Sequence, residues 1–186
     1  NPINEQDMLG LFGGVKEFQD CGDPELWPGK KTTRTDISAV VQKACGKLAN
    51  AIKAIDDYAT IRGRLHPNAQ KVFDDKGKRD EIKKNLEKAK KRCDADDIVI
   101  QCVCGSVKDN DGLQAWVPVS GLAYGDLHIV EGVFGDSIPD HMVLLLAYEI
   151  SHYGDTPSRT GESIASDYDQ IIDHLSRAWE QGEKKK

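Results

Sequence analysis

Three polar side chains at the end of an apolar run have the types and spacing for metal chemistry. The run, MVLLLAYEISHY from Met142 to Tyr153, contains Tyr148, Glu149 and His152. In a helix, residues four apart share a face, so Tyr148 and His152 point the same way with Glu149 beside them. An imidazole and a phenol can bind a metal ion, and a neighbouring carboxylate can take a proton from metal-bound water. The spacing therefore predicts a candidate metal site on one helix.

The run has the layout of the zinc-protease motif H-E-x-x-H, with Tyr148 in place of the first histidine. In the intact motif two histidines bind zinc and the glutamate acts as general base. The shorter pattern E-x-x-H is common, and apolar helix ends often carry Tyr and His for packing. A purely structural role is therefore the alternative that this motif leaves open.

The elements that must position the site follow from hydrophobic periodicity. Residues 1–35 show no sustained period, which predicts an irregular N-terminal arm. Residues 36–186 are expected to form a single domain. An Asp-Gly pair predicts a hairpin between the first two strands. Helices are expected at 36–62, 66–73, 78–92, from 137–140 through His152, and at 164–179, with strands at 98–104, 113–119 and 127–130. This order predicts an α+β domain with N-terminal helices, a small antiparallel sheet, an active-site-type helix and a C-terminal helix.

Composition narrows the class of protein. The 186 residues, 39% of them hydrophobic, suffice for one domain with a core. No apolar run is long enough to span a membrane. A net charge of -6 disfavours nucleic-acid binding, and the Lys-rich segment 76–92 contains enough acidic residues to be interpreted as a solvated helix face. We expect a soluble monomer with no nucleic-acid or membrane partner.

Five cysteines indicate an oxidising environment. They are Cys21, Cys45, Cys93, Cys102 and Cys104. We expect two disulfides and one remaining thiol, which favours a secreted, extracellular protein. Antiparallel packing of helix 78–92 on helix 36–62 would bring Cys93 near Cys45, and this pair is the first choice. The rest of the connectivity is open at this point.

The order of these features resembles the aspzincin metalloendopeptidases of fungi and bacteria, which include deuterolysin and the peptidyl-Lys metalloendopeptidases. Beyond YEISH, four segments carry the resemblance, in family order. Residues 70–73 with 79–89 resemble the family's helix pair around the W-F-G element, and IQCVC at 100–104 resembles its C-x-C strand. AWVP at 115–118 resembles its A-x-V-x-P strand, and IVEGVF at 129–134 resembles its strand ending C-G-x-F.

The resemblance implies a zincin-like fold, a zinc cofactor and a set of site residues. The family binds zinc through both histidines of its motif and an aspartate of a later G-T-x-D-x-x-Y-G element. The matching positions make His152 and Asp167 ligands, with Tyr148 in the third position. Glu149 becomes the general base, and Tyr168, in the aspartate element, a second candidate catalytic residue.

Three positions depart from the family pattern. Tyr148 stands for a histidine, no Tyr-Gly closes the aspartate element, and Glu131 stands where the family has a cysteine. The last departure would leave Cys104 without its family partner. Cys21 with Cys102 is then the expected second disulfide, and Cys104 the thiol.

The tyrosine bears on catalysis. A free phenol ionises near pH 10 and imidazole near 6.5, so a tyrosine ligand releases its proton at a cost in zinc affinity. Without Tyr148, two protein ligands remain, fewer than a catalytic zinc uses. We therefore expect a secreted zincin-like protein with weakened zinc binding and lost or impaired peptidase activity. It would bind an extracellular protein or peptide, or a carbohydrate.

Two alternatives stay open. One is an active zinc metalloendopeptidase with Tyr148, His152 and Asp167 on zinc and Glu149 as base, cutting next to lysine as its relatives do. The other is a helical interaction domain in which YEISH is a coincidence. That domain would have no cleft around Glu149 and no Asp167 near His152.

The remaining histidines are expected to be structural. His141 lies two turns, roughly 10 Å, before Tyr148, too far to replace it as a ligand. His128 and His174 are interpreted as packing or surface residues, although His174 could approach the site from the final helix. His66 starts a helix.

Overall fold

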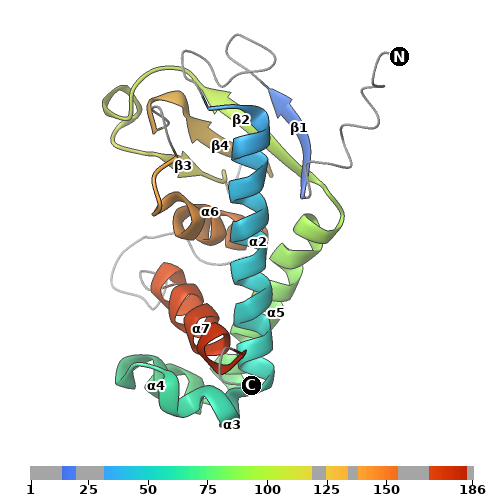
Figure 1. Ribbon diagram of the computed structural model, residues 1–186, viewed down its shortest axis with the longest axis vertical. Coiled ribbons are helices and arrows are strands. Elements are labelled where there is room, and N and C mark those ends of the chain that lie inside the picture. The colour runs from blue at the N-terminus through green and yellow to red at the C-terminus, as the bar shows by residue number, and fades with distance from the viewer. Residues whose placement is uncertain (1–13, 20–31, 119–124, 134–137, 155–167, 184–186) are drawn as a thin grey trace.

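A computed structural model describes residues 14–19, 32–118, 125–133, 138–154 and 168–183. These residues form six α-helices and a four-stranded mixed sheet (Figure 1). The helices are α2 (Arg34–Asp56), α3 (Tyr58–Ile61), α4 (Pro67–Asp74), α5 (Lys76–Asp94), α6 (Met142–Ser151) and α7 (Tyr168–Glu183); the strands are β1 (Val15–Gln19), β2 (Ile98–Val103), β3 (Ala115–Trp116) and β4 (Leu127–Val130). The α+β class is therefore confirmed.

The sheet is mixed, so the expected antiparallel sheet is wrong. Its order is β1-β2-β4-β3, with β2 parallel to both β1 and β4, and β3 antiparallel to β4. The predicted hairpin does not form. Asp111 and Gly112 take positive φ angles of 55° and 81°, but the strand that follows them, β3, pairs with β4 and not with β2. Alternating apolar residues identify a strand, whereas its partner depends on contacts distant in sequence.

The first strand lies inside the segment expected to be irregular. Val15–Gln19 pairs in parallel with β2, and the Val15 side chain is buried. Val15 and Phe18 are its only apolar residues, so the strand has no period-two signal of its own. Its pairing with β2 compensates for that weak local pattern.

Helix α2 starts and ends earlier than its apolar pattern predicts. Thr33 is the N-cap, and its side chain and the Asp36 carboxylate accept each other's backbone N–H, at 3.2 and 2.9 Å. The chain leaves the helix at Asp57 and continues as α3 and a 3-10 turn at Arg62–Arg64. The apolar period thus covers two helices.

The disulfide between Cys45 and Cys93 is confirmed, with a Cα–Cα distance of 6.0 Å. It joins the middle of α2 to the end of α5. Further along, Lys83 Nζ of α5 lies 2.6 Å from Asp56 Oδ1 at the end of α2, so the two helices are antiparallel, as expected.

A second disulfide and a single thiol are present as expected, but the predicted pairing of Cys21 with Cys102 and the free thiol at Cys104 are wrong. Cys102 is not part of a disulfide; its side chain lies in the core side of β2 and is 4% exposed. Cys104 is disulfide-bonded, and its partner lies outside the described residues. Cys104 follows the end of β2 and is exposed, which makes it accessible for a crosslink, whereas Cys102 is held against the core. Cys21 also lies outside the described residues.

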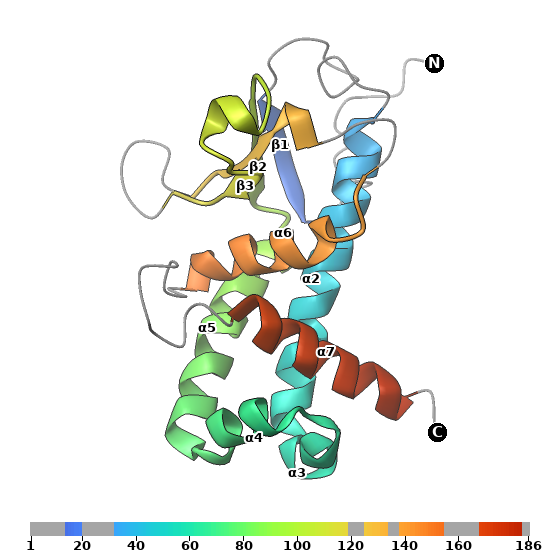
Figure 2. The same ribbon diagram turned by 90° about the vertical axis from the view of Figure 1, so that its left-hand side faces the viewer.

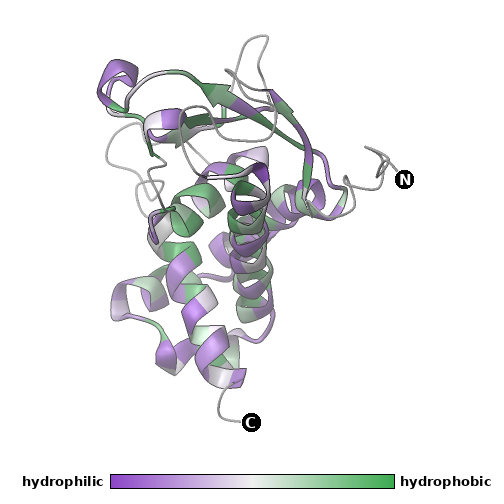
Figure 3. Ribbon diagram, turned by 45° about the horizontal axis from the view of Figure 1, so that its top comes forward, coloured by the Kyte–Doolittle hydropathy of each residue, from purple (hydrophilic) through white to green (hydrophobic). Residues whose placement is uncertain are grey.

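The elements stack along the long axis of α2. Figure 2 shows the sheet at one end, α6 crossing beneath it, α7 beneath α6, and α3 and α4 at the opposite end. Hydrophobic residues follow most of α6, which is enclosed between sheet and helices (Figure 3). The core runs through all these layers and includes Ile37, Leu48, Phe73, Leu86, Ile100, Ile129 and Leu146. None of the helices in the described part of the chain has the length and apolar character to cross a membrane.

Candidate functional site

Helix α6 carries the motif into the interior. Pro139 precedes the helix, and its carbonyl accepts the N–H of Met142 at 3.0 Å. Residues 146–151, the last turns of α6, are all buried, whereas residues 143–145 are half-buried. Tyr148 is 4% exposed, and Glu149 and His152 are each 8% exposed. All three motif side chains are therefore buried in the interior.

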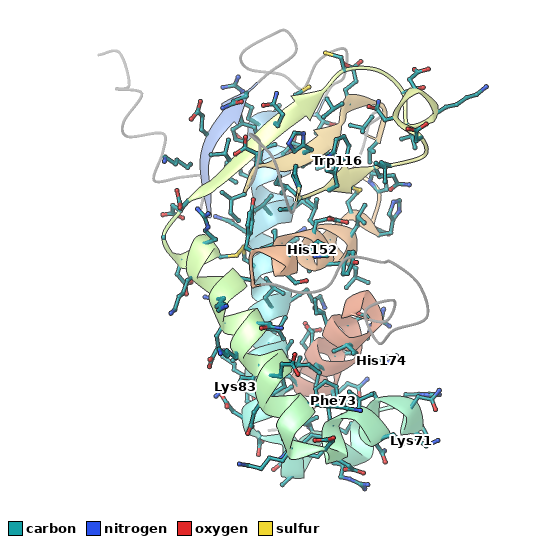
Figure 4. All side chains as sticks on the ribbon, turned by 180° about the vertical axis from the view of Figure 1, so that it is seen from behind. Lys71, Phe73, Lys83, Trp116, His152 and His174 are labelled. Atoms are coloured by element: carbon teal, nitrogen blue, oxygen red, sulfur yellow. A yellow bond between two sulfur atoms is a disulfide. The ribbon has the colours of Figure 1, made fainter. Side chains whose placement is uncertain are left out.

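A cleft of about 650 Å³ opens between α6 and the segment that contains β3. All three motif side chains line it, together with Asp173 of α7. The opposite wall is the unbroken segment 112–117, and Figure 4 shows Trp116 on the sheet side above His152. The helix contributes His141, Leu144, Leu145, Tyr148, Glu149 and His152. The cleft is therefore mostly apolar, with its titratable groups at the end of α6 and at its rim.

The Glu149 carboxylate connects helix and sheet. Its Oε2 accepts a hydrogen bond from the backbone N–H of Val117 at 3.2 Å. The same oxygen lies 3.7 Å from Nε2 of His152. Val117 directly follows β3, so Glu149 holds the edge of the sheet against α6. A buried carboxylate needs such donors, because burial without them is costly.

The rings of Tyr148 and His152 pack against each other. Their centroids are 4.7 Å apart and their planes meet at 72°, an edge-to-face arrangement. This contact follows from the four-residue spacing of the two side chains on one helix face. Tyr148 thus fills space beside the imidazole where the zinc motif has a second imidazole.

The described residues contain only part of the expected zinc site. Across the described ranges, no three His, Cys, Asp or Glu side chains are grouped so as to hold a metal ion. Glu149 and His152 form a pair, whereas catalytic zinc uses three protein ligands. Asp167 lies outside the described residues, and Tyr168 is described only as the first backbone position of α7. Their predicted roles stay predictions.

One histidine that sequence reasoning set aside belongs to the cleft. His141, next to the start of α6, lines it, and its Nε2 lies 2.7 Å from Oε1 of Gln114 on the opposite wall. The pair bridges strand segment and helix at the end away from His152. His141 is seven residues before Tyr148, and this spacing was the signal that both face one cleft.

The other histidines lie elsewhere. His174 of α7 stacks on His66, the N-cap of α4, with ring centroids 6.1 Å apart. Figure 4 shows α7 next to α4, with His174 labelled. His128 stacks under Trp116 at 5.0 Å, and its Nε2 has no hydrogen-bond partner in the described part of the chain. Burial lowers the pKa of His128, and the nearby charge of Asp126 partly opposes this.

The cleft residues missed from the sequence are Gln114, Trp116 and Asp173. Trp116 was placed on a strand, but no local pattern shows that this strand is the sheet edge above α6. Asp173 lies within the predicted final helix, and its carboxylate accepts a hydrogen bond from Arg177 Nε at 2.7 Å.

Comparison with known proteins adds no relative. No family model matches the chain, and no curated protein matches it. The functional interpretation therefore rests on the motifs and on the geometry of the cleft.

Proposed function

We propose that this chain is a secreted zincin-like protein whose cleft binds an extended segment of an extracellular protein without cleaving it. The observation that carries the proposal is the position of Glu149 and His152: a buried carboxylate–imidazole pair under an edge strand, with the Tyr148 ring where a second imidazole would complete a zinc site. The Cys45–Cys93 disulfide supports an oxidising compartment.

The wall of the cleft favours a peptide as ligand. Six consecutive residues, 112–117, line it, and β3 within them lies at the edge of the sheet, next to β4. An edge strand offers backbone groups to a peptide that adds a further strand. Trp116, Leu144 and Leu145 supply apolar surface for the side chains of such a peptide.

The surroundings of Glu149 argue against hydrolysis. Its Oε2 accepts the Val117 N–H and lies beside His152, so the carboxylate has a structural role in joining β3 to α6. General-base catalysis in a zinc peptidase also needs an activated water on the metal. Of the candidate ligands, the described residues include Tyr148 and His152. The Tyr148 phenol would have to release its proton to bind the metal, which weakens the affinity for zinc.

Metal analysis separates the proposal from an active enzyme. Purified protein should contain less than stoichiometric zinc, and a chelator should leave its melting temperature unchanged. Stoichiometric zinc together with cleavage of casein would overturn the proposal. It would favour the active metalloendopeptidase instead, with Tyr148, His152 and Asp167 on zinc and Glu149 as base.

The variant Tyr148→His tests the kinship with zinc peptidases. In a zincin scaffold with Asp167 in place, it restores a three-residue ligand set, and zinc affinity measured by calorimetry should rise by at least about a hundredfold. The matched control is Tyr148→Phe, which keeps the ring and should not gain zinc affinity. An unchanged affinity in Tyr148→His would mean that Asp167 is not positioned as a ligand.

Peptide selection tests the binding role. Random peptides displayed on phage are selected on the whole protein, and a selected peptide is titrated while tryptophan fluorescence is recorded. Leu145→Arg places a long cation in the cleft and should weaken binding about tenfold or more. Val72→Arg, on α4 outside the cleft, is the control and should bind normally. Equal binding by both variants would exclude the cleft as the peptide site.

The interaction-domain alternative predicts no cleft around Glu149. The 650 Å³ cleft bordered by this residue counts against that alternative. Its second prediction concerns Asp167 and is not tested by the described residues.

A further inference from the structure

A second surface with a distinct chemistry lies on α5, away from the cleft. The helix carries nine basic and four acidic side chains, a local charge of +5 in a chain whose net charge is -6. Its buried stripe, Ile82, Leu86, Ala89 and Cys93, faces the core, so the charges occupy its other faces. Figure 4 shows α5 on the outside of the molecule, with Lys83 labelled. Such a local excess of charge attracts ligands of opposite sign.

The basic face borders a groove between α2 and α5. The groove has a volume of about 580 Å³. Ala49 and Ile52 of α2 contribute apolar side chains, and both are half-buried. Lysines line it from both helices: Lys53 from α2, and Lys84, Lys88, Lys90 and Lys91 from α5. Glu87 and Asp94 also line the groove, so five lysines lie beside two carboxylates. Apolar surface with an excess of one sign of charge distinguishes this groove from an ordinary solvated helix face.

Several charges on α5, in the groove and beside it, are already compensated within the protein. Lys83 pairs with Asp56 at 2.6 Å and with Glu87 at 3.4 Å. Lys90 pairs with Asp94. Lys84 and Lys91, by contrast, are exposed and make no ion pair with any described carboxylate. These two lysines are therefore available to a ligand.

The spacing of the two lysines matches a helical ligand. Lys84 and Lys91 are seven residues, two helical turns, apart, which places their Cα atoms about 10 Å from each other along α5. Carboxylates two turns apart on another helix have the same spacing. Apolar residues between them would meet Ala49 and Ile52. An amphipathic helix lying in a groove uses this combination of contacts.

We propose that the α2–α5 groove is a docking site for an acidic amphipathic helix of a partner protein. The apolar residues favour this ligand, because a sulfated glycan has no apolar face to pack on Ala49 and Ile52, and a flat membrane surface does not reach side chains that are half-buried in a groove. The site is separate from the cleft, and the proposal does not depend on the proposed function of the cleft.

The test uses two labelled synthetic peptides of identical composition. One has a leucine stripe at helical spacing and glutamates two turns apart along its flank; the other is scrambled so that no stripe remains. Binding to the whole protein is measured by fluorescence anisotropy. The striped peptide should bind at least about tenfold more tightly than the scrambled one, and added salt should weaken its binding.

Variants locate the binding. Lys84→Glu with Lys91→Glu should weaken the striped peptide at least about tenfold, and Ile52→Ser should weaken it with no change in charge. The matched control is Lys71→Glu with Lys78→Glu, two exposed lysines outside the groove with the same change in charge. Far-ultraviolet circular dichroism checks that each variant is folded.

Three results would overturn the proposal. They are equal binding of the striped and scrambled peptides, equal losses in the groove and control variants, and binding of heparin or phosphatidylserine vesicles that is sensitive to Lys84 and Lys91 but unaffected by Ile52→Ser. Unchanged binding of the striped peptide to Leu145→Arg supports it, because that variant alters the cleft alone.

Discussion

Ionisable side chains are buried at the cleft end of the molecule, formed by α6 and β3, and exposed at its helical end, formed by α3 and α4. At the cleft, Glu149 and His152 are each 8% exposed, beside an open cavity and a sheet edge. At the helical end, Arg62 and Asp74 form an ion pair at 2.6 Å with side chains 49% and 44% exposed. Burying ionisable groups costs stability, whereas an exposed pair costs and contributes little. The comparison teaches that the cleft is where the sequence departs from what stability alone favours.

Apolar packing stabilises the helical end, and a disulfide stabilises the layer between the helical end and the sheet. Phe73 of α4 is fully buried and packs against the Tyr58 ring, with centroids 6.2 Å apart. The disulfide ties α2 to α5 where the helical layers meet the sheet. Changes in this region should therefore alter stability with little effect on ligand binding, and the reverse should hold for the cleft.

The largest expected effect comes from the helical core. Phe73→Ala should lower the free energy of unfolding by about 3–5 kcal/mol, because it removes a fully buried ring and leaves a cavity. Urea unfolding measures the loss. Peptide affinity of the cleft, measured well below the melting temperature, should not change. Lys71→Ala, at an exposed residue of α4 outside the cleft, serves as the near-neutral control. A loss of peptide affinity in Phe73→Ala would mean that the two ends are coupled.

Removal of the confirmed disulfide should have the next largest effect. Cys45→Ser with Cys93→Ser should cost about 2–4 kcal/mol, since the crosslink closes a loop with a sequence separation of 48. Guanidinium unfolding of the double variant gives the value. Cys102→Ser, which removes no disulfide, is the comparison. Equal stability of the double variant and the wild type would contradict the structural role assigned to this bridge.

Two glycines sharpen the contrast between the ends. A Cβ built on Gly154, two residues after His152, would lie 1.8 Å from the Asn85 carbonyl oxygen of α5. Gly154→Ala should therefore cost about 1–3 kcal/mol through overpacking. A Cβ on Gly46, within α2, meets nothing within 4 Å, so Gly46→Ala should stabilise by about 0.5–1 kcal/mol. Thermal unfolding of both variants checks these opposite signs, and a destabilised Gly46→Ala would contradict the open space beside α2.

The smallest effects are in the pH dependence, and each end has its own range. Burial lowers the pKa of His128 in the folded protein. As the pH decreases, His128 is therefore protonated in the unfolded chain before it is protonated in the folded protein. Its contribution to the free energy of unfolding is complete above about pH 6.5 and is lost as the pH decreases from there. Hydrogen bonds from Arg62 and Tyr58 lower the pKa of Asp74. Its contribution is full above about pH 4 and is lost as the pH decreases further.

Urea midpoints across the acid range separate the two groups. His128→Phe, which keeps a ring against Trp116, should flatten the decline just below about pH 6.5. Asp74→Asn should flatten the decline below about pH 4 and leave the higher range unchanged. The same pH profile in both variants and the wild type would show that neither group contributes.

Much of the site on α6 was predictable because its signals are local. The four-residue spacing of Tyr148 and His152 determines that they share a face, and the structure brings both to one cleft with Glu149. The wall opposite was not predictable in this way. Trp116 and Gln114 reach the cleft only because β3 pairs with β4 instead of β2.

By itself, the sequence determined most of the helices and strands, including α4, α5 and β4, and that Cys45 and Cys93 meet between antiparallel helices. It did not determine β1, which depends on its pairing with β2. Only the tertiary structure decided the order of the strands, the burial of Cys102, the bonding of Cys104 and the pairing of His141 with Gln114. The physical reason is the range of the interactions. Backbone periodicity and capping act within a few residues, whereas strand partners and cleft walls are selected by the packing of the whole chain.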